Sequence, residues 1–331
     1  MKYLLLTCLL LLFFVLSLFI GSIYIPPLEI LSVLTGGEAS RGVYSFIILS
    51  TRLPQALTAI LCGAALSTSG LLLQTAFRNP LAGPGVFGVS SGASMGVAFV
   101  MLAFGGTMSL TGVGASGMLA VLLGAFLGAI AVTILLLVFS AFVRGTTMLL
   151  IVGIMTGYLA SSVVALLNFW ASAEGLRTYV LWGMGSFSAI PARFMPFYIY
   201  MVIACLLLSL LLIKPLNLLQ LGERYAKSLG LHVENVRRLL LLLTGMLTAI
   251  TTAFCGPVSF IGLAVPHLAR LVFRTADHRQ LLPNTMLIGA IVALGCQLIC
   301  QLPVWSTLLP INVVTPLLGA PTVLYVILKK K

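Results

Sequence analysis

Residues 214–238, KPLNLLQLGERYAKSLGLHVENVRR, form the one long polar stretch in a chain of 331 residues. They hold seven of its charged side chains, which number 18 basic and 6 acidic in total. Around this stretch the chain is strongly apolar, with 60% hydrophobic residues and a mean hydropathy of +1.19. Inside lipid only helices and closed barrels satisfy every backbone hydrogen bond, and apolar runs of about 20 residues suit spanning helices. The sequence therefore predicts an all-α membrane protein, a single transmembrane domain over 1–331, with one loop in water.

The apolar runs predict about ten membrane spans, because each span needs about 20 residues and the connections are short. Gly256 and Pro257 are expected to turn the chain between the seventh and eighth spans. The first run resembles a signal peptide, but no small-x-small cleavage site follows it, so we interpret it as an uncleaved span. The expected spans are 3–23, 52–75, 86–104, 114–142, 147–170, 194–213, 239–256, 257–273, 281–302 and 309–328.

The positive charges indicate the orientation, since basic residues in short loops stay in the cytoplasm. With the N-terminus inside, 14 of the 18 basic residues lie on the inner side. The four on the outer side are Arg41, Arg52, Arg177 and Arg193. This distribution predicts a multi-pass protein with both termini and the polar loop in the cytoplasm. The net charge of +12 then reflects topology and contact with the lipid bilayer, and no nucleic acid is expected as a partner.

The sequence lacks the groups with which a membrane protein drives transport or catalysis by itself. All six acidic residues lie outside the expected spans, whereas proton-coupled pumps usually bind the ion at an intramembrane carboxylate. No Gly-x-x-x-x-Gly-Lys-Ser/Thr phosphate loop occurs, so the energy for uphill transport must come from another subunit. Cys296 and Cys300 share a helix face, but without a His or further Cys nearby they predict no metal site. A proton- or sodium-coupled secondary transporter is the alternative, and a membrane-embedded enzyme is disfavoured.

Two pairs of glycines occur at four-residue spacing, Gly92 with Gly96 and Gly124 with Gly128. Such pairs let helix backbones approach closely in lipid, where no hydrophobic effect drives association. We interpret them as packing positions rather than as gating elements.

The polar loop predicts two short helices. Residues 216–221 are expected to form the first, Gly222 to break it, and residues 223–229 to form the second, which Gly230 ends. Acid at the start of the second helix and a base in its last turn suit the helix dipole, and glycine just after a helix is a common C-cap. Two interfacial helices resting on lipid are the alternative, although such helices commonly carry a stronger basic face. The side chains available for packing are Leu221, Tyr225, Ala226 and Leu229.

Five stretches of the chain resemble the permeases of the iron-chelate and cobalamin family of type II ABC importers. The polar loop matches at Leu216-Asn217, Leu221-Gly222-Glu223, Ala226 and Leu229-Gly230. The second and eighth spans match at Arg52-Leu53-Pro54 and at Phe260-x-Gly262-Leu263-x-x-Pro266-His267-x-x-Arg270. The loop after the second span matches at Arg78-Asn79-Pro80-Leu81-Ala82, and the outer segment at Trp182-Gly183-x-Gly185-Ser186. The resemblance runs from about residue 25 to Gly319-Ala320-Pro321, which makes the set highly specific.

This resemblance implies a type II ABC importer permease bundle of about ten helices that is not itself an enzyme. The functional unit would be two copies of this chain, two cytoplasmic ATP-binding subunits and an extracytoplasmic substrate-binding protein. The pathway would follow the dimer axis. ATP and Mg²⁺ would be bound by the partner ATPase, and no cofactor by this chain. The family further implies the cytoplasmic membrane of a bacterium and a metal chelate as substrate, with haem, a ferric siderophore and a cobalamin left open.

The resemblance also carries functional residues over to this sequence by position. The coupling loop, about 214–238, would contact the ATPases through Leu216, Asn217, Leu221, Gly222, Glu223, Ala226, Leu229 and Gly230. The cytoplasmic gate would include Asn79, Pro80, Leu81, Thr146 and Thr147. Pro80 disfavours helical geometry at its predecessor, so a polar amide and an apolar leucine are expected to be held at a turn. Capping of a helix N-terminus is the alternative role for the two threonines.

The outer face departs from the family pattern. The family commonly has a second arginine after Arg-Leu-Pro, where this chain has Gln55, and an Asp and an Arg near the end of the ninth span, where this chain has Cys296 and Cys300. An acidic and a basic residue lost together leave no unpaired charge in the membrane. Arg52 and Gln55 are the candidate positions for docking the binding protein, and a membrane-border arginine is the alternative for Arg52.

Overall fold

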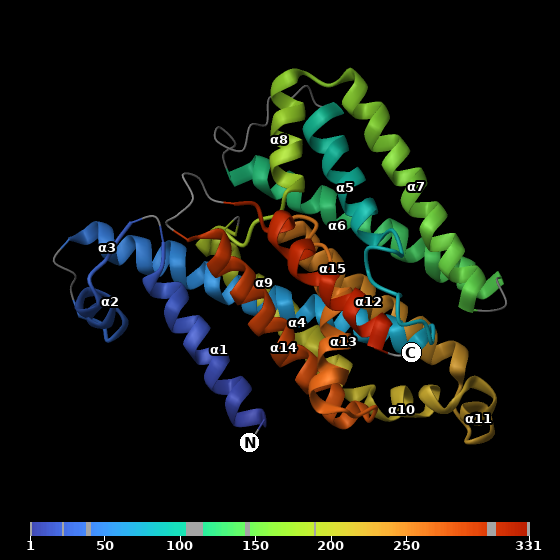
Figure 1. The fold of residues 1–331 in the computed structure, drawn as a ribbon. Coiled ribbons are helices and arrows are strands. Elements are labelled where there is room, and N and C mark those ends of the chain that lie inside the picture. The colour runs from blue at the N-terminus through green and yellow to red at the C-terminus, as the bar shows by residue number, and fades with distance from the viewer. Residues whose placement is uncertain are drawn as a thin grey trace.

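A computed structural model describes residues 2–21, 23–37, 41–103, 115–142, 146–188, 190–302 and 309–329. Across these ranges the regular structure is helical, and no strand occurs. Figure 1 shows the helices in one bundle, with both termini and helices α10 (Ile213–Leu221) and α11 (Glu223–Ser228) toward its lower and right-hand side. The described part of the chain therefore confirms the predicted all-α class.

Helix α4 (Leu53–Ala76) is the centre of the bundle, and most of its side chains are buried. Its main neighbours are the helices α9 (Met195–Leu211), α12 (Val233–Cys255), α13 (Ile261–Phe273) and α14 (His278–Cys300). Two of its buried hydroxyl groups have partners on neighbouring helices: Ser69 Oγ lies 3.1 Å from Thr248 Oγ1 on α12, and Ser67 Oγ donates to the carbonyl oxygen of Thr285 on α14. A central helix in a membrane can carry polar groups because such interhelical bonds satisfy them.

Helices α5 (Val89–Ala98) and α6 (Ala115–Phe142) pack backbone against backbone. A Cβ added to Gly96 would overlap the carbonyl oxygen of Gly124, and one added to Gly128 would overlap that of Gly92. The structure thus confirms the two glycine pairs as packing positions. Helix α5 continues into a π-helical turn, η2 (Phe99–Ala103), and α7 (Thr146–Trp170) lies against both.

The remaining elements lie around this core. The first is α1 (Lys2–Phe19), which packs mainly against α14. Four elements lie at the top and left of Figure 1, on the opposite side of the bundle from α10 and α11. They are α2 (Pro27–Leu34), α3 (Gly42–Ile47), the π-helical turn η1 (Ile48–Arg52) and α8 (Ala173–Gly183). Two further elements are the 3₁₀ turn η3 (Ala192–Phe194) and helix α15 (Ile311–Lys329).

Each of the ten predicted spans coincides with an apolar helix. Six helices are long and apolar enough to cross a membrane, and α9 with α10, bent by 50°, would make a seventh. Three further spans correspond to shorter apolar helices, at Val89–Leu102, Ile261–Phe273 and Ile311–Tyr325. The predicted turn between the seventh and eighth spans is confirmed, since Gly256 adopts a φ of 74° and ends α12.

Among the starts of the predicted spans, the second and the seventh differ most from the structure. The second span was predicted to begin at residue 52, but its helix starts at Gly42, because α3 and η1 continue directly into α4. The seventh span was predicted to begin at residue 239, but α12 starts at Val233, so the end of the predicted polar loop is helical. Val233 is buried at that point, and burying an apolar side chain favours helix over an exposed loop.

Candidate coupling and gating site

The polar loop folds as the predicted helix, break and helix. α10 ends at Leu221, Gly222 adopts a φ of +117°, and α11 follows to Ser228. Gly230 then takes a φ of +84°. Positive φ values of this kind favour glycine, because an added Cβ clashes with the backbone. The two glycines therefore fix the turn before α11 and the turn after it.

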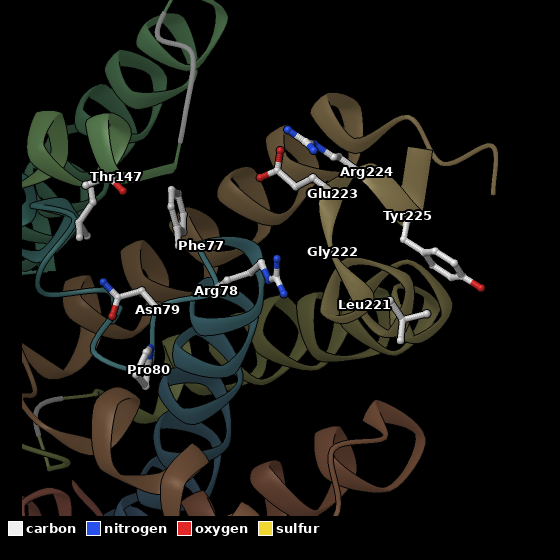
Figure 2. Close-up of a pocket in the computed structure, with 11 residues that line it drawn as sticks. Phe77, Arg78, Asn79, Pro80, Thr147, Leu221, Gly222, Glu223, Arg224 and Tyr225 are labelled. Carbon is white, nitrogen blue, oxygen red and sulfur yellow. The ribbon is translucent and has the colours of Figure 1, made fainter. Parts of the chain in front are cut away.

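The eight predicted coupling residues divide into an inner and an outer set. Leu216 and Ala226 are fully buried and attach the two helices to the bundle. Leu221 and Leu229 are exposed by 62% and 53% of their surface, and Tyr225, which is not one of the eight, by 55%. Figure 2 shows the side chains of Leu221 and Tyr225 directed away from the bundle. The exposed surface of this unit therefore carries three large apolar side chains beside the exposed Arg224 and Lys227.

Glu223 forms an ion pair with Arg237 of α12, which holds the start of α11 against the bundle. Arg237 is nearly buried, with 14% of its side chain exposed, whereas Glu223 is 41% exposed. A charge-assisted hydrogen bond is stronger when it is partly shielded from water. The sequence motif contained Glu223, but its partner could be recognised only in the tertiary structure.

Asn217 lies on the inner side of α10 and contacts the start of α14. Its Nδ2 donates to Asp277 Oδ1 at 2.7 Å, and its Oδ1 accepts from the backbone N–H of His278 at 2.8 Å. The backbone N–H of Arg279 also donates to the Asp277 carboxylate, and these two donors lower the pKa of Asp277. Asn217 is thus a tether between α10 and α14.

The predicted gate residues 79–81 lie in a tight turn after α4. Arg78 adopts a φ of 47°, and the backbone N–H of Leu81 donates to Asn79 Oδ1 at 2.9 Å. The turn is attached to α13, because His267 Nε2 lies 2.8 Å from the carbonyl oxygen of Pro80. Leu81 projects with half of its surface exposed. We refer to residues 78–81 as the gate loop.

A second attachment lies one turn back, at the end of α4. Gln74 Oε1 accepts a hydrogen bond of 2.6 Å from Arg270 Nη1, and Gln74 Nε2 donates to the carbonyl oxygen of Leu263. Gln74, Pro80, His267 and Arg270 come from two sequence stretches far apart in the chain. The motif at the end of the second span and the motif of the eighth span therefore meet in one contact between α4 and α13.

The gate loop lines a groove together with α10 and α11, which we refer to as the coupling helices. The groove has a volume of about 950 Å³. Figure 2 shows Asn79, Pro80 and Thr147 on one side and Gly222 and Glu223 on the other. Four residues to which no role was assigned from the sequence also line the groove. They are Phe77, Arg78, Leu150 and Arg224, of which Arg78 belongs to the motif of the gate loop. Thr147 stands in the first turn of α7 and is exposed, and the side chain of Thr146 lies outside the described part.

Arg52 is not available on the outer surface as the docking prediction requires. Only 4% of it is exposed, and its guanidinium donates to the carbonyl oxygens of Leu18 and Phe19 at 2.6 and 3.1 Å and also to that of Ile23. The carbonyls of Leu18 and Phe19 belong to the last turn of α1, where helical partners are lacking, and Ile23 follows that helix. The geometry therefore makes Arg52 the C-terminal cap of α1, and we correct its expected exposure.

Gln55 is likewise buried and accepts a hydrogen bond of 2.7 Å from Gln301 Nε2. Cys296 and Cys300 are both buried free thiols. Over the described residues, no group of three His, Cys, Asp or Glu side chains is close enough to hold a metal ion. The exposed basic side chains on this outer side include Arg41 and Arg177.

Comparison with known proteins identifies relatives along nearly the whole chain. The model of the FecCD transport family matches residues 9–329. The vitamin B12 import system permease protein BtuC of Klebsiella pneumoniae is 36% identical over 329 residues, which is 98% of this chain and 93% of that protein. The BtuC protein of Salmonella typhi is also 36% identical, over 324 residues, 98% of this chain and 94% of the relative.

Solved structures agree in fold. A metal-chelate type ABC transporter in an inward-facing conformation superposes with a TM-score of 0.84 at 32% identity, covering 98% of this chain and 97% of that one. PsaBC from Streptococcus pneumoniae shares the fold with a TM-score of 0.55 at 18% identity, covering 83% of this chain and 90% of its own. This chain belongs to the FecCD transport family and has the fold of a type II ABC importer permease.

Proposed function

We propose that this chain is the membrane-spanning permease subunit of an ATP-driven importer for a metal chelate, and that two copies form the pathway. The observation that carries the proposal is the groove in which the gate loop faces the coupling helices. A displacement of α11 needs to cross only this groove to reach Asn79 and Pro80. The permease itself binds no ATP, and hydrolysis belongs to two partner subunits.

The apolar outer face of α10 and α11 is the surface we assign to the ATPase. Leu221, Tyr225 and Leu229 expose more than half of their surface in a segment that is otherwise polar. Exposed apolar side chains rimmed by charges are typical of protein interfaces. Glu223 is tied to Arg237 at the base of this surface, so a force on α11 is transmitted to α12 rather than lost in a mobile loop.

We place this surface in the cytoplasm, and the protein in the bacterial cytoplasmic membrane. Lys2 Nζ donates to the carbonyl oxygen of Val272 at the end of α13, so the N-terminus lies on the same side as that helix end. Asn217 of α10 contacts Asp277 there as well. Basic residues collected at one end of a bundle mark the cytoplasmic side, and the C-terminus is expected there too.

The transport cycle we propose is a shift between two populations. ATP binding would bring the two ATPases together, move α11, and change the fraction of complexes in which the gate loop is open. A ligand or partner shifts such an equilibrium only as far as it prefers one state. The extracytoplasmic binding protein would deliver the substrate to the opposite end, where Arg52 and Gln55 support the docking surface from beneath rather than forming it.

The substrate class we propose is a metal chelate. It is the class named for the neighbouring solved transporter, and vitamin B12, the substrate named for the BtuC relatives, is a cobalt chelate. Cobalamins, ferric siderophores and haem are the members that fit the family. A secondary transporter is not favoured, because family membership and the coupling groove both point to a partner ATPase.

The test is affinity purification of the tagged chain from its native membrane in mild detergent, for wild type and Glu223→Arg. We expect an ATPase subunit to purify with the wild-type chain in equal ratio. Glu223→Arg should reduce the recovery of the ATPase subunit or its transport-coupled activity, because the variant places a second positive side chain beside Arg237. Transport by a chain that purifies alone and responds to a proton or sodium gradient would refute the proposal.

A further inference from the structure

A buried polar bridge joins coupling helix α10 to the inner end of α4. Asn217 Oδ1 lies 2.8 Å from His278 Nδ1, and His278 Nε2 lies 2.9 Å from Thr75 Oγ1 on α4. The imidazole has no exposed surface, and Thr75 is only 7% exposed. Both ring nitrogens therefore have partners, one on each of two helices that are not adjacent in sequence.

The hydrogen-bond directions in this bridge follow from Asn217. Its Nδ2 donates to Asp277 Oδ1, so the amide orientation leaves Oδ1 as the acceptor facing His278. His278 must then carry a proton on Nδ1, which leaves Nε2 of the neutral ring as an acceptor. The Thr75 hydroxyl shares its one proton between this nitrogen and the carbonyl oxygen of Leu71, 2.9 Å from each. The backbone N–H of His278 donates to the same Asn217 oxygen at 2.8 Å. The three side chains are thus held in a single arrangement.

The bridge ends where the gate loop begins. Thr75 is in the last turn of α4, and its carbonyl oxygen accepts a hydrogen bond from the N–H of Arg78. The neighbouring Gln74 carbonyl accepts from the N–H of Asn79 at 3.2 Å. The backbone that carries the first two residues of the gate loop is therefore bonded directly to the residues at the end of the bridge.

The end of the bridge formed by His278 and Thr75 is shielded from water, whereas Asn217 is half-buried. Removing one partner from a buried hydrogen bond leaves the other without a partner, which destabilises the folded state. Water cannot replace the lost partner at a ring with no exposed surface. Any displacement of α10 should therefore move the end of α4 with it.

We propose that Asn217, His278 and Thr75 form the joint that transmits movement of the coupling helices to the gate loop. His278 and Thr75 are positioning residues in this inference, since neither lines the groove nor meets the ATPase surface. The inference rests on the proposed function and adds to it the route by which the movement travels. A merely structural bridge would stabilise the fold without changing how much transport each ATP supports.

The test compares Thr75→Val with Thr285→Val in the complete complex reconstituted with its ATPases and binding protein. Valine has nearly the shape of threonine but lacks the hydroxyl. Thr285 is the matched control because it is fully buried on α14 and its hydroxyl donates within its own helix, to the carbonyl of Leu281 at 2.7 Å. Thr75 Oγ1 likewise lies 2.9 Å from the carbonyl oxygen of Leu71 in its own helix, but it shares its one proton with His278 Nε2, so the pair differs in the contact with His278. Thr75→Ser, which keeps the hydroxyl, is the rescue variant.

Two quantities are measured, ATP hydrolysed per substrate transported and the nucleotide-dependent reactivity of a cysteine at the gate. The probe is Leu81→Cys with Cys8→Ser, because Cys8 is the exposed native thiol and the other five are buried. A membrane-impermeant thiol reagent, added on the cytoplasmic side, reports the opening of the gate loop. Thermal stability is recorded for each variant.

We expect Thr75→Val to raise the ATP cost per transported substrate about fivefold, the factor that corresponds to one lost hydrogen bond. The same variant should abolish most of the nucleotide-dependent change at residue 81, and Thr75→Ser should restore both. Thr285→Val should behave as wild type. Normal coupling in Thr75→Val, or an equal loss of coupling in Thr285→Val, would refute the proposal that these residues form the joint. Failure of the proposed function is seen separately, as absence of ATP-dependent uptake by the wild-type complex.

Discussion

Gly96 of α5 lies so close to Gly124 of α6 that no side chain fits between them, since a Cβ at Gly96 would overlap the Gly124 carbonyl oxygen. The contact is reciprocal, because a Cβ at Gly124 would lie 2.9 Å from the Gly96 carbonyl oxygen. Two helices in lipid lack a hydrophobic force between them, so van der Waals contact at this distance is a main source of their association.

We predict that Gly96→Ala destabilises the bundle by about 1–3 kcal/mol, the usual cost of overpacking. The measurement is thermal unfolding of the purified protein in detergent, followed by fluorescence. Gly183→Ala is the matched control, because Gly183 also lies in a helix but has no atom within 4 Å of an added Cβ. Equal melting temperatures for the two variants would show that α5 and α6 can separate without loss of stability.

Arg52→Met should destabilise the end of α1. The variant removes the donor to the carbonyl oxygens of Leu18, Phe19 and Ile23, and hydrogen bonds from a charged group contribute about 1.5–3 kcal/mol. We expect a lower melting temperature than for Arg177→Met, the control at an exposed outer arginine. Binding of the extracytoplasmic protein should be weakened by Arg52→Glu only in proportion to this loss of structure. Weaker binding with an unchanged melting temperature would instead restore the docking role.

Reversing the ion pair at α11 should restore what a single reversal removes. Glu223→Arg places like charges beside Arg237 and should uncouple ATP hydrolysis from transport. The double variant Glu223→Arg, Arg237→Glu recreates an opposite-charge pair, and we expect it to recover a large part of the coupling. Uptake and hydrolysis in proteoliposomes are the measurement. A double variant no better than Glu223→Arg would indicate that Glu223 acts through direct contact with the ATPase.

Gly222→Pro should uncouple transport for a different reason. Gly222 has a φ of +117°, whereas proline fixes φ near −65°, so the turn between α10 and α11 cannot form. We expect normal insertion into the membrane and loss of ATP-driven uptake. Gly42→Ala is the control at a glycine without positive φ or a nearby atom. Wild-type uptake by Gly222→Pro would refute the coupling role of this turn.

The gate turn should depend on an acceptor at residue 79. Asn79→Leu removes the oxygen that accepts from the Leu81 N–H, whereas Asn79→Asp keeps it. We therefore expect Asn79→Leu to increase leakage of substrate from loaded proteoliposomes in the absence of ATP, by about fivefold for one lost hydrogen bond. Asn79→Asp should leak little more than wild type. Equal leakage from both variants would show that the side-chain acceptor does not hold the gate.

Much of the helical architecture could be predicted from local composition. Ten apolar runs predicted ten spans, and each coincides with an apolar helix, because the cost of an unsatisfied backbone in lipid permits few alternatives. The glycine spacing predicted close packing at both pairs, although not that the pairs meet each other, and Gly222 and Gly230 predicted both breaks in the polar loop. The start of α12 at Val233 was missed, since whether a charged segment is helical depends on what buries its apolar face.

The site was predicted only in part, for the same physical reason. Asn79 and Glu223 were singled out from separate motifs, but nothing local shows that they line one groove. Arg52 was assigned to the docking surface from the family resemblance, whereas the structure turns it toward the carbonyls at the end of α1. His278 received no role, since its two partners are 61 and 203 residues away along the chain.

The sequence by itself determined the class, the spans, the breaks and the family, because these follow from hydropathy, charge and backbone conformation at individual positions. The tertiary structure decided which polar groups meet: Arg237 with Glu223, His267 with Pro80, and His278 between Asn217 and Thr75. Hydrogen bonds between distant segments depend on how the helices pack, and helix packing is a property of the whole bundle rather than of any one stretch.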